Sequence, residues 1–396
     1  MKIIHTSDWH LGQTFFGYDR AEEHRVFLNW LGDIIREKEI DLLLVAGDIF
    51  DSPNPSAESQ KIYYKFIKRI TTENPSLKIV ITAGNHDSAA RLEAPNPLLE
   101  EMRVTVRGVV HRTPEGCIDF ERHIIPVSDD TCCLAVPYLR QGDFLAANSH
   151  SEGVKDFYGT LCKIASGKYD TIIAMGHLQA TGAEISNDDR SERTTIGGLD
   201  AVSPDFSCEG IAYTALGHLH KAQRVSNREN MRYSGAPLPM SFAERNYRQS
   251  VTMVIAGNGE VKVEKIPFDA PVKLLTIPRS HLPIDEVIKE LDLLPDGEID
   301  NYSPFLEVQV AIDGPDPARR QKIEQAIEGK AVRLARIVAV SPQNSNGESA
   351  LLSYDDFKNI RPIELAKIVY KRKFNNCEMP DNLVEMLTKV IKEVEV

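Results

Sequence analysis

Short apolar runs that each end in a polar segment recur through the first 220 residues of this 396-residue chain. The run at residues 78–82 is rich in β-branched residues and leads into Gly-Asn-His-Asp at residues 84–87. Such a run predicts a buried strand that delivers polar side chains to the edge of a sheet. Open α/β sheets place their functional sites at this edge. The pattern therefore predicts an α/β fold whose site is built from strand ends.

The same arrangement recurs along the chain, with amphipathic segments between the first three runs. Residues 20–38 and 57–70 have apolar side chains at helical spacing, so the first part is predicted to be β-α-β-α-β. Asp8 and His10 are two residues apart, and an extended strand end would point both side chains the same way. The predicted strands with polar ends are residues 2–5, 42–46, 78–82, 171–175 and 211–216, and a hairpin is predicted at 251–266.

Composition changes near Pro271, and the rest of the chain has no polar strand ends. Alternating strand and helix patterns predict a small α+β unit, followed by a polar linker at 342–349. A last helix carries an apolar stripe, which favours a partner's groove over this chain's own core because it lies beyond the linker. The stripe consists of Leu383, Met386, Leu387, Val390, Ile391 and Val394.

The polar residues at the strand ends combine carboxylate, amide and imidazole groups. Each one alone fits an ordinary turn or a solvated histidine, but five such elements in one chain argue for a shared site. This mixture suits manganese, iron or zinc better than calcium or magnesium. Two ions sharing one carboxylate can cleave phosphate esters, with His86 as a spare imidazole to supply a proton. The candidate ligands are Asp8, His10, Asp48, Asn85, His177, His218 and His220.

In order and spacing, these elements resemble the signature of the calcineurin-like metallophosphoesterases. The segments 4–12, 45–51, 83–88, 215–220 and 233–237 are more similar still to the SbcD family of bacterial nuclease subunits. This resemblance implies a β-sandwich flanked by helices, plus a small α+β capping domain and a helical C-terminal tail. It divides the chain into a nuclease domain at 1–268, a DNA-facing cap at 269–345 and a tail at 346–396 that binds an ATPase.

The resemblance also implies roles for individual residues. One metal ion would take Asp8, His10, Asp48 and His220, and the other would take Asp48, Asn85, His177 and His218. His86 would protonate the leaving group, and the Asp51 carboxylate would orient His86. The two ions are expected to be manganese.

The activity implied by the family is cleavage of DNA phosphodiesters. It comprises 3′-to-5′ exonuclease action on double-stranded ends and endonuclease action on hairpins and single strands, in repair, recombination and replication. The partner would be an SbcC-type coiled-coil ATPase, with a homodimer of this chain inside a heterotetramer. Two other readings remain open: a phosphodiesterase acting on small molecules, and a DNA-binding scaffold with structural metals.

Charge and cysteine content limit these readings. The net charge of −12 argues against nucleic-acid binding by bulk charge, so metals, a local patch or a partner must hold DNA. Arg103, Arg107, Arg122 and Arg140 are candidates for such a patch, although scattered arginines are usually only solvated. The first residues do not predict a signal peptide, and no run of the sequence predicts a membrane span. Its six cysteines lack a Cys-x-x-Cys spacing, which predicts reduced thiols in a cytoplasmic protein.

Overall fold

The computed structural model describes residues 1–144, 147, 149–184, 201–206, 210–257, 260–312, 317–340 and scattered positions between 363 and 387. Contacts divide the chain into two units, Met1–Val340 and Ser341–Val396. The predicted linker at 342–349 lies outside the described residues, as do Val390, Ile391 and Val394 of the stripe. Its other three members, Leu383, Met386 and Leu387, are helical. No helix in the described part of the chain is long and apolar enough to cross a membrane.

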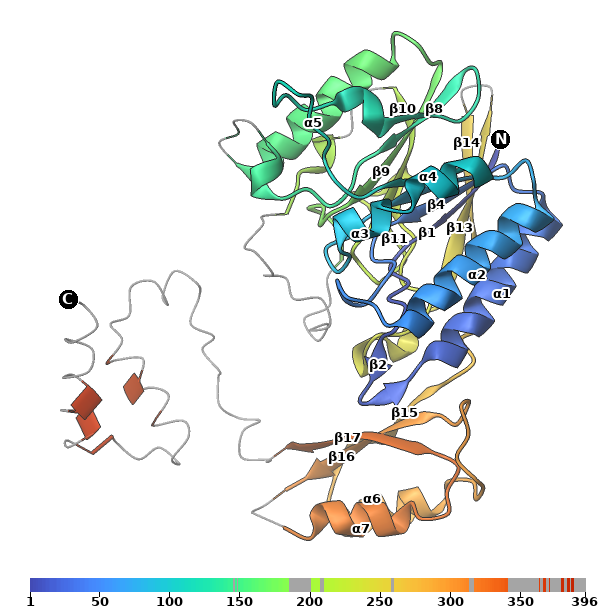
Figure 1. Ribbon diagram of the computed structural model, residues 1–396. Coiled ribbons are helices and arrows are strands. Elements are labelled where there is room, and N and C mark those ends of the chain that lie inside the picture. Colours follow the sequence, from blue (N-terminus) through green and yellow to red (C-terminus); the bar gives the residue numbers. More distant parts are fainter. Residues whose placement is uncertain are drawn as a thin grey trace. The chain divides into compact units, whose positions relative to one another are not determined.

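The first unit contains two six-stranded sheets (Figure 1). In the first sheet, with order β14-β13-β1-β4-β5-β6, the last four strands run parallel. Its members are β1 (Lys2–Thr6), β4 (Leu42–Ala46), β5 (Lys78–Thr82), β6 (Val104–Arg107), β13 (Ser250–Gly257) and β14 (Glu260–Pro267). The second sheet has the order β11-β12-β10-β9-β8-β7. Its members are β7 (Ile124–Pro126), β8 (Thr131–Ala135), β9 (Thr171–His177), β10 (Ile211–Gly217), β11 (Gln223–Val225) and β12 (Arg228–Tyr233).

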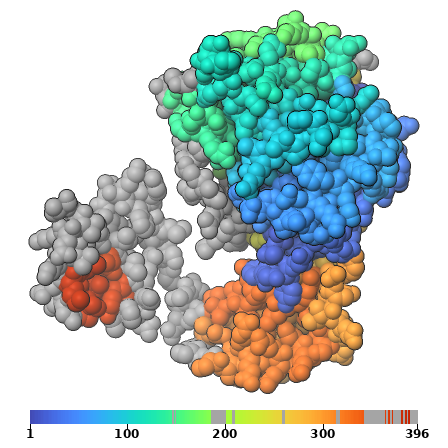
Figure 2. Space-filling view, viewed as in Figure 1, coloured from blue at the N-terminus to red at the C-terminus, as the bar shows by residue number. Residues whose placement is uncertain are grey.

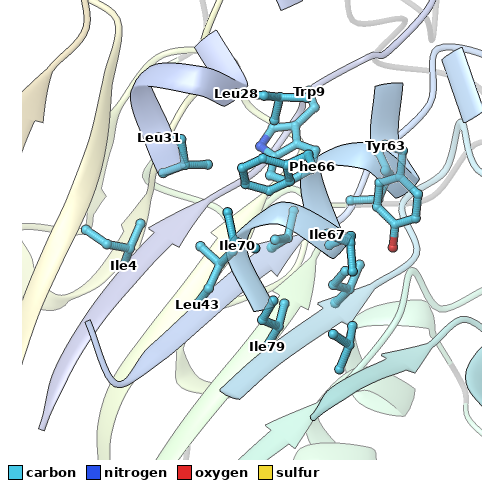
Figure 3. Packing of buried hydrophobic residues seen from close by; sticks show 14 of the residues in the cluster. Ile4, Trp9, Leu28, Leu31, Leu43, Tyr63, Phe66, Ile67, Ile70 and Ile79 are labelled. Atoms are coloured by element: carbon cyan, nitrogen blue, oxygen red, sulfur yellow. The ribbon is translucent and has the colours of Figure 1, made fainter. Parts of the chain in front are cut away.

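Helices cover the outer face of each sheet. The amphipathic helices α1 (Ala21–Lys38) and α2 (Ala57–Glu73) pack on the first sheet, and their residues form much of the blue surface in Figure 2. Figure 3 shows their apolar side chains over Ile4, Leu43 and Ile79 of the strands. Helix α5 (His150–Ala165) covers the second sheet. Shorter helices α3 (Ala89–Glu93) and α4 (Asn96–Leu99) and the 3₁₀ turns η1 (Glu100–Met102), η2 (Phe120–His123), η3 (Gln141–Asp143) and η4 (Pro204–Phe206) lie in connections.

The two sheets pack face to face, which gives four layers in the order helix, sheet, sheet, helix. Side chains of Leu42 and Leu44 from β4 belong to the same buried cluster as Ile173 and Tyr213 from the second sheet. All five residues of β4 are buried, because helices cover one face of the strand and the second sheet covers the other. The predicted sandwich flanked by helices is confirmed.

A smaller sheet follows the sandwich, with parallel strands in the order β15-β16-β17. Helices α6 (Ile284–Asp292) and α7 (Arg319–Ala326) pack against it around a separate apolar core. The strands are β15 (Leu274–Leu282), β16 (Phe305–Ala311) and β17 (Arg333–Val340).

An aromatic cluster joins this cap to the sandwich. Phe305 of β16 packs with Phe15 and with Phe242 of the 3₁₀ turn η5 (Phe242–Asn246). Phe15 lies in the short hairpin of β2 (Thr14–Phe15) and β3 (Tyr18–Asp19). The guanidinium of Arg333 lies 3.8 Å from the Phe305 ring centroid, a cation–π contact that adds to the burial of the rings.

The sequence reading missed helix α5, because its two glycines and its threonine and cysteine are poor helix formers. Burial of Val154, Phe157 and Leu161 against the second sheet outweighs that local preference. The expectation of reduced thiols throughout is wrong for Cys162, which is disulfide-bonded; Cys117, Cys132 and Cys133 are free. The lack of a Cys-x-x-Cys spacing therefore did not exclude a disulfide bond.

His5 lies fully buried where the two sheets meet, and it generates a stability prediction. Tyr213 donates its hydroxyl proton to Nδ1 (2.9 Å), and Nε2–H donates to the Leu216 carbonyl (3.2 Å), so the neutral ring is fully hydrogen-bonded. Burial lowers the pKa of His5 to about 3, below its unfolded value of 6.5. The unfolded chain therefore binds one more proton than the folded chain between these pH values.

Because of this difference, the free energy of unfolding should fall as pH drops below 6.5, by on the order of 1 kcal/mol per pH unit from His5 alone. Urea unfolding between pH 6.5 and 4.5 measures the slope, and His5→Gln should make it shallower. His281→Gln, at an exposed histidine, is the matched control. Equal slopes for wild type and His5→Gln would contradict the account.

Candidate metal centre

The predicted strand ends meet at one place, where the C-terminal edges of both sheets come together. The first sheet supplies the residues after β1, β4 and β5, and the second supplies those at the ends of β9 and β10. Three groups of side chains place their ligand atoms within 4.8 Å of one another, and adjacent groups share members. These groups are Asp8, His10 and His220; His10, Asp48 and His86; and Asp8, Asp48 and His177.

The backbone at this edge is not extended, contrary to the expectation for Asp8 and His10. Four of the residues have positive φ: Asp8 (54°), His10 (47°), Asp48 (51°) and His218 (106°). Non-glycine residues with positive φ cost roughly 1–3 kcal/mol each and persist only where the surrounding structure holds them. Sharp turns, rather than strand periodicity, therefore bring the side chains together.

Hydrogen bonds between the turns hold this conformation. The backbone N–H of Asp8 donates to the Gly47 carbonyl, and that of His10 donates to the Asp48 carbonyl, both at 3.0 Å. The Asp8 carboxylate accepts from the His218 N–H (3.0 Å), and the Asp48 carboxylate accepts from the His86 N–H (2.9 Å). Each of these carboxylates therefore fixes a neighbouring turn.

Two glycines are required by close approach of the turns. A Cβ at Gly84 would lie 2.1 Å from Oδ1 of Asp48, and a Cβ at Gly217 would lie 1.8 Å from the Ala46 carbonyl oxygen. Real side chains do not come this close, so any larger residue at either position would displace the Asp48 or His218 turn.

The first candidate ligand set surrounds Asn85. Its Oδ1 lies 2.9 Å from His177 Nε2 and 3.1 Å from His218 Nδ1, and His177 Nε2 lies 3.2 Å from Asp48 Oδ2. The Ala46 carbonyl can only accept, so the contact at 2.9 Å places a proton on His177 Nδ1. Nε2 then faces two acceptor oxygens, an arrangement that a bound cation or a proton on Nε2 satisfies.

Electrostatics at this set favour positive charge. Burial alone would lower the pKa of His177, but the Asp48 carboxylate raises it to about 9. The Asp48 pKa moves the other way: burial would raise it, and the charge of His177 holds it well below the usual range. Asp48, with 2% of its surface exposed, is therefore an ionised carboxylate surrounded by imidazoles.

The second candidate set contains His10 and His220. His10 is buried and neither ring nitrogen forms a hydrogen bond with a described residue, although Nδ1 lies 3.3 Å from Asp51 Oδ1 and Nε2 lies 3.7 Å from Asp48 Oδ2. His220 Nδ1 lies 3.1 Å from Glu244 Oε1, and His220 offers a ligand atom within 4.8 Å of those of Asp8 and His10. The two ring nitrogens of His10, buried without hydrogen bonds and beside carboxylates, fit a divalent ion.

His86 lies beside both sets and is half-buried. Its Nδ1 contacts the backbone carbonyl of Asp51 at 2.9 Å, and its ring centroid lies 4.8 Å from that of His10. The Asp51 carboxylate contacts His10 rather than His86. The contact expected between Asp51 and His86 is thus made by the main chain, because the side chain is turned toward the ligand set.

Sequence reasoning missed two supporting carboxylates. Glu244 has 1% of its surface exposed, and besides His220 it accepts from the Met240 N–H at 2.8 Å. It lies in the 3₁₀ turn η5, where no periodicity marks it. Asp87 belongs to the Gly-Asn-His-Asp segment and accepts from the N–H groups of Ile49 and Phe50 (3.1 and 2.9 Å). It therefore ties the turn after β5 to the turn after β4.

Comparisons with known proteins agree with this geometry. Residues 1–222 match the model of the calcineurin-like phosphoesterases, and residues 270–374 match that of the type 5 capsule protein repressor C-terminal domain. The SbcD protein of the SbcCD nuclease from Rhodobacter capsulatus is 37% identical over 369 residues, which are 88% of this chain and 90% of the relative. The chain belongs to the SbcD family.

Two further relatives are also named as the SbcD subunit of the SbcCD nuclease. That of Escherichia coli is 32% identical over 295 residues (69% of this chain and 70% of the relative), and that of Bacillus subtilis is 31% identical over 323 residues (78% and 80%). The predicted fold class, a calcineurin-like α/β sandwich, is therefore confirmed. The chain is a metal-dependent phosphodiesterase of a nuclease family, and the metals of this family are divalent.

Glu244 generates a prediction about this centre. Glu244→Gln should weaken binding of one divalent ion by about 10- to 100-fold, because the glutamate fixes the ring of His220 and raises its basicity. Titration of the metal-free protein with Mn²⁺, followed by the electron paramagnetic resonance of free Mn²⁺, measures both affinities. Glu229→Gln, which removes an exposed acid, is the control. If Glu244→Gln bound both ions as tightly as wild type, the positioning role would be wrong.

Proposed function

We propose that this chain hydrolyses DNA phosphodiester bonds with two divalent ions, preferably manganese. Its reactions are 3′-to-5′ exonuclease cleavage of double-stranded ends and endonuclease cleavage of hairpins and single strands. The observation that carries the proposal is the shared position of Asp48, whose carboxylate lies beside His177 of one ligand set and His10 of the other. Two adjacent ions can share a carboxylate only if that carboxylate lies beside both ligand sets, as Asp48 does.

The proposed ligand sets are those implied by the family signature. Each contains two side chains with carboxylate or amide oxygens together with two imidazoles, in keeping with manganese. When bound, the pair of ions activates a water molecule and neutralises charge on the phosphate. The ion at the second set is assigned to Asp8, His10, Asp48 and His220, and the ion at the first set, around Asn85, to Asp48, Asn85, His177 and His218.

His86 is proposed to protonate the leaving oxygen. In its imidazolium form, Nδ1–H donates to the Asp51 carbonyl, and Nε2–H carries the proton that is transferred. The carbonyl fixes the ring without competing for that proton. Asp51 is thus a positioning residue for His86 through its main chain, while its carboxylate acts on His10.

The relatives are each named as the SbcD component of the SbcCD nuclease, which supports a partner of the SbcC type, a coiled-coil ATPase. We assign residues 1–268 to the nuclease domain, 269–345 to a cap that faces DNA and 346–396 to the ATPase-binding tail. The proposed assembly is a homodimer of this chain within a cytoplasmic heterotetramer that acts in repair, recombination and replication. Exposure of Leu383 and Met386 leaves part of the apolar stripe open to such a partner.

Two other functions remain less well supported. A phosphodiesterase for small molecules would use the same ligands but has no need of the segment that matches the second family model. A scaffold with structural metals has no need of an imidazole held beside the ligand sets, as His86 is. Manganese-dependent digestion of an end-labelled duplex and a hairpin, with and without the ATPase, separates all three functions.

The proton-donor role predicts the behaviour of His86→Ala. Cleavage of DNA should fall by roughly 10²–10⁴, the usual effect of losing a general acid, while metal binding persists. A bis-nitrophenyl phosphate, whose leaving group needs no proton, should lose far less. Asp51→Asn keeps the carbonyl contact that positions His86, so a loss in this variant should arise through His10 and be similar on DNA and on the nitrophenyl ester. Equal losses on DNA and on the nitrophenyl ester would rule out proton donation.

The tail generates a separate prediction, because residues 341–396 form their own unit. Removal of residues 350–396 should leave metal content and cleavage of the nitrophenyl ester unchanged. It should abolish co-purification with the ATPase and the stimulation of DNA cleavage. A truncated protein that is insoluble or free of metal would place the tail in this chain's own core.

A further inference from the structure

A cavity outside the metal centre lies between the sandwich and the cap, with a volume of about 550 Å³. One wall comes from the segment 244–249, which includes part of η5, and the other from the start of β15. Its floor is apolar, with Phe268 and Val272 buried and Leu274 half-buried. We call this cavity the junction cleft; its volume is in the usual range for ligand sites.

Three exposed cations line the junction cleft: Arg245, Arg248 and Lys273. Arg245 donates to the Phe242 carbonyl, which fixes the stem of its side chain. The charged groups of Arg248 and Lys273 form no ion pair or hydrogen bond within the described part of the chain. Among the described residues, the only exposed acid lining the cleft is Asp269.

Some cations elsewhere on this acidic surface are held in ion pairs. Arg25 contacts Glu22 and Glu58, and Arg69 contacts both Asp33 and Glu73. In a chain of net charge −12, two unpaired cations and a third anchored one in a single cleft form a local positive field. Such a field attracts anions and concentrates them where it lies.

The junction cleft adjoins the segment that supports the metal centre. Glu244 lines the cleft, and its carboxylate holds His220 at 3.1 Å. Tyr247 lines the same wall, with the Lys221 ammonium 6.0 Å from its ring centroid. The cleft therefore combines cations, an aromatic ring and an apolar floor, the combination by which proteins hold a single nucleic-acid strand.

We propose that the junction cleft binds a single strand of nucleic acid by its phosphodiester backbone. Arg245, Arg248 and Lys273 contact phosphates, and Tyr247 stacks on a base or sugar. Three cations drawn from two segments suit successive phosphates of a strand better than one isolated phosphate. The proposal rests on the proposed nuclease function for its ligand class, and it adds a strand-holding site outside the metal centre.

The test measures binding rather than cleavage, so that it does not depend on nuclease activity. Full-length protein in EDTA is titrated into a fluorescein-labelled 20-nucleotide strand at several salt concentrations. Arg248→Gln with Lys273→Gln should lower affinity about tenfold near 0.15 M salt. It should also make the slope of log affinity against log salt shallower by about 1.4, which is about 0.7 for each lost phosphate contact. Circular dichroism confirms that the variant is folded.

The matched control is Lys262→Gln with Lys289→Gln, which removes the same charge from exposed positions outside the cleft. Wild-type slope and affinity in this control support the proposal. Equal losses in both double variants, or none in the cleft variant, would overturn it. Competition with deoxythymidine monophosphate distinguishes a free nucleotide from a strand: displacement of the strand at equal molar concentration would contradict strand binding. Failure of the nuclease function is a separate result, namely no DNA cleavage by wild type with Mn²⁺.

Discussion

The buried carboxylate of Asp48 is the feature on which the rest of the site depends. A carboxylate removed from water is costly unless cations and hydrogen-bond donors surround it. Here the His86 N–H donates to it, and His177 and His10 approach it from the two ligand sets. Its position after the central strand β4 places it where both sheets can contribute partners.

The four-layer sandwich explains why this position exists. Parallel strands of each sheet end at the same edge, so one sheet supplies Asp8, Asp48 and Asn85 while the other supplies His177 and His218. Packing on both faces of β4 fixes the strand, and the stability of that packing offsets the strain of positive φ at the turns. The metal centre and the core of the protein are therefore coupled: a change that shifts one sheet against the other would separate the ligand sets.

Much of this could be predicted from sequence, and the failures have physical causes. Apolar runs ending in Asp, Asn and His identify strand ends, and parallel strands bring such ends together, so the ligand candidates could be found. The backbone geometry of Asp8 and His10 could not be predicted from the sequence. Their positive φ angles are imposed by hydrogen bonds from another turn. The role of Glu244 could not be recognised in the sequence, because its contact with His220 depends on the tertiary packing of a 3₁₀ turn. Helix α5 was missed because burial, not propensity, stabilises it.

We propose that two divalent ions lie side by side and share Asp48. The most direct test is electron paramagnetic resonance of the full-length protein titrated with Mn²⁺. Two ions roughly 3.5–4 Å apart interact magnetically, so the account predicts two ions bound per chain and the broadened, multiline spectrum of a coupled pair. Saturation at one ion per chain, with the six-line spectrum of isolated Mn²⁺, would contradict it.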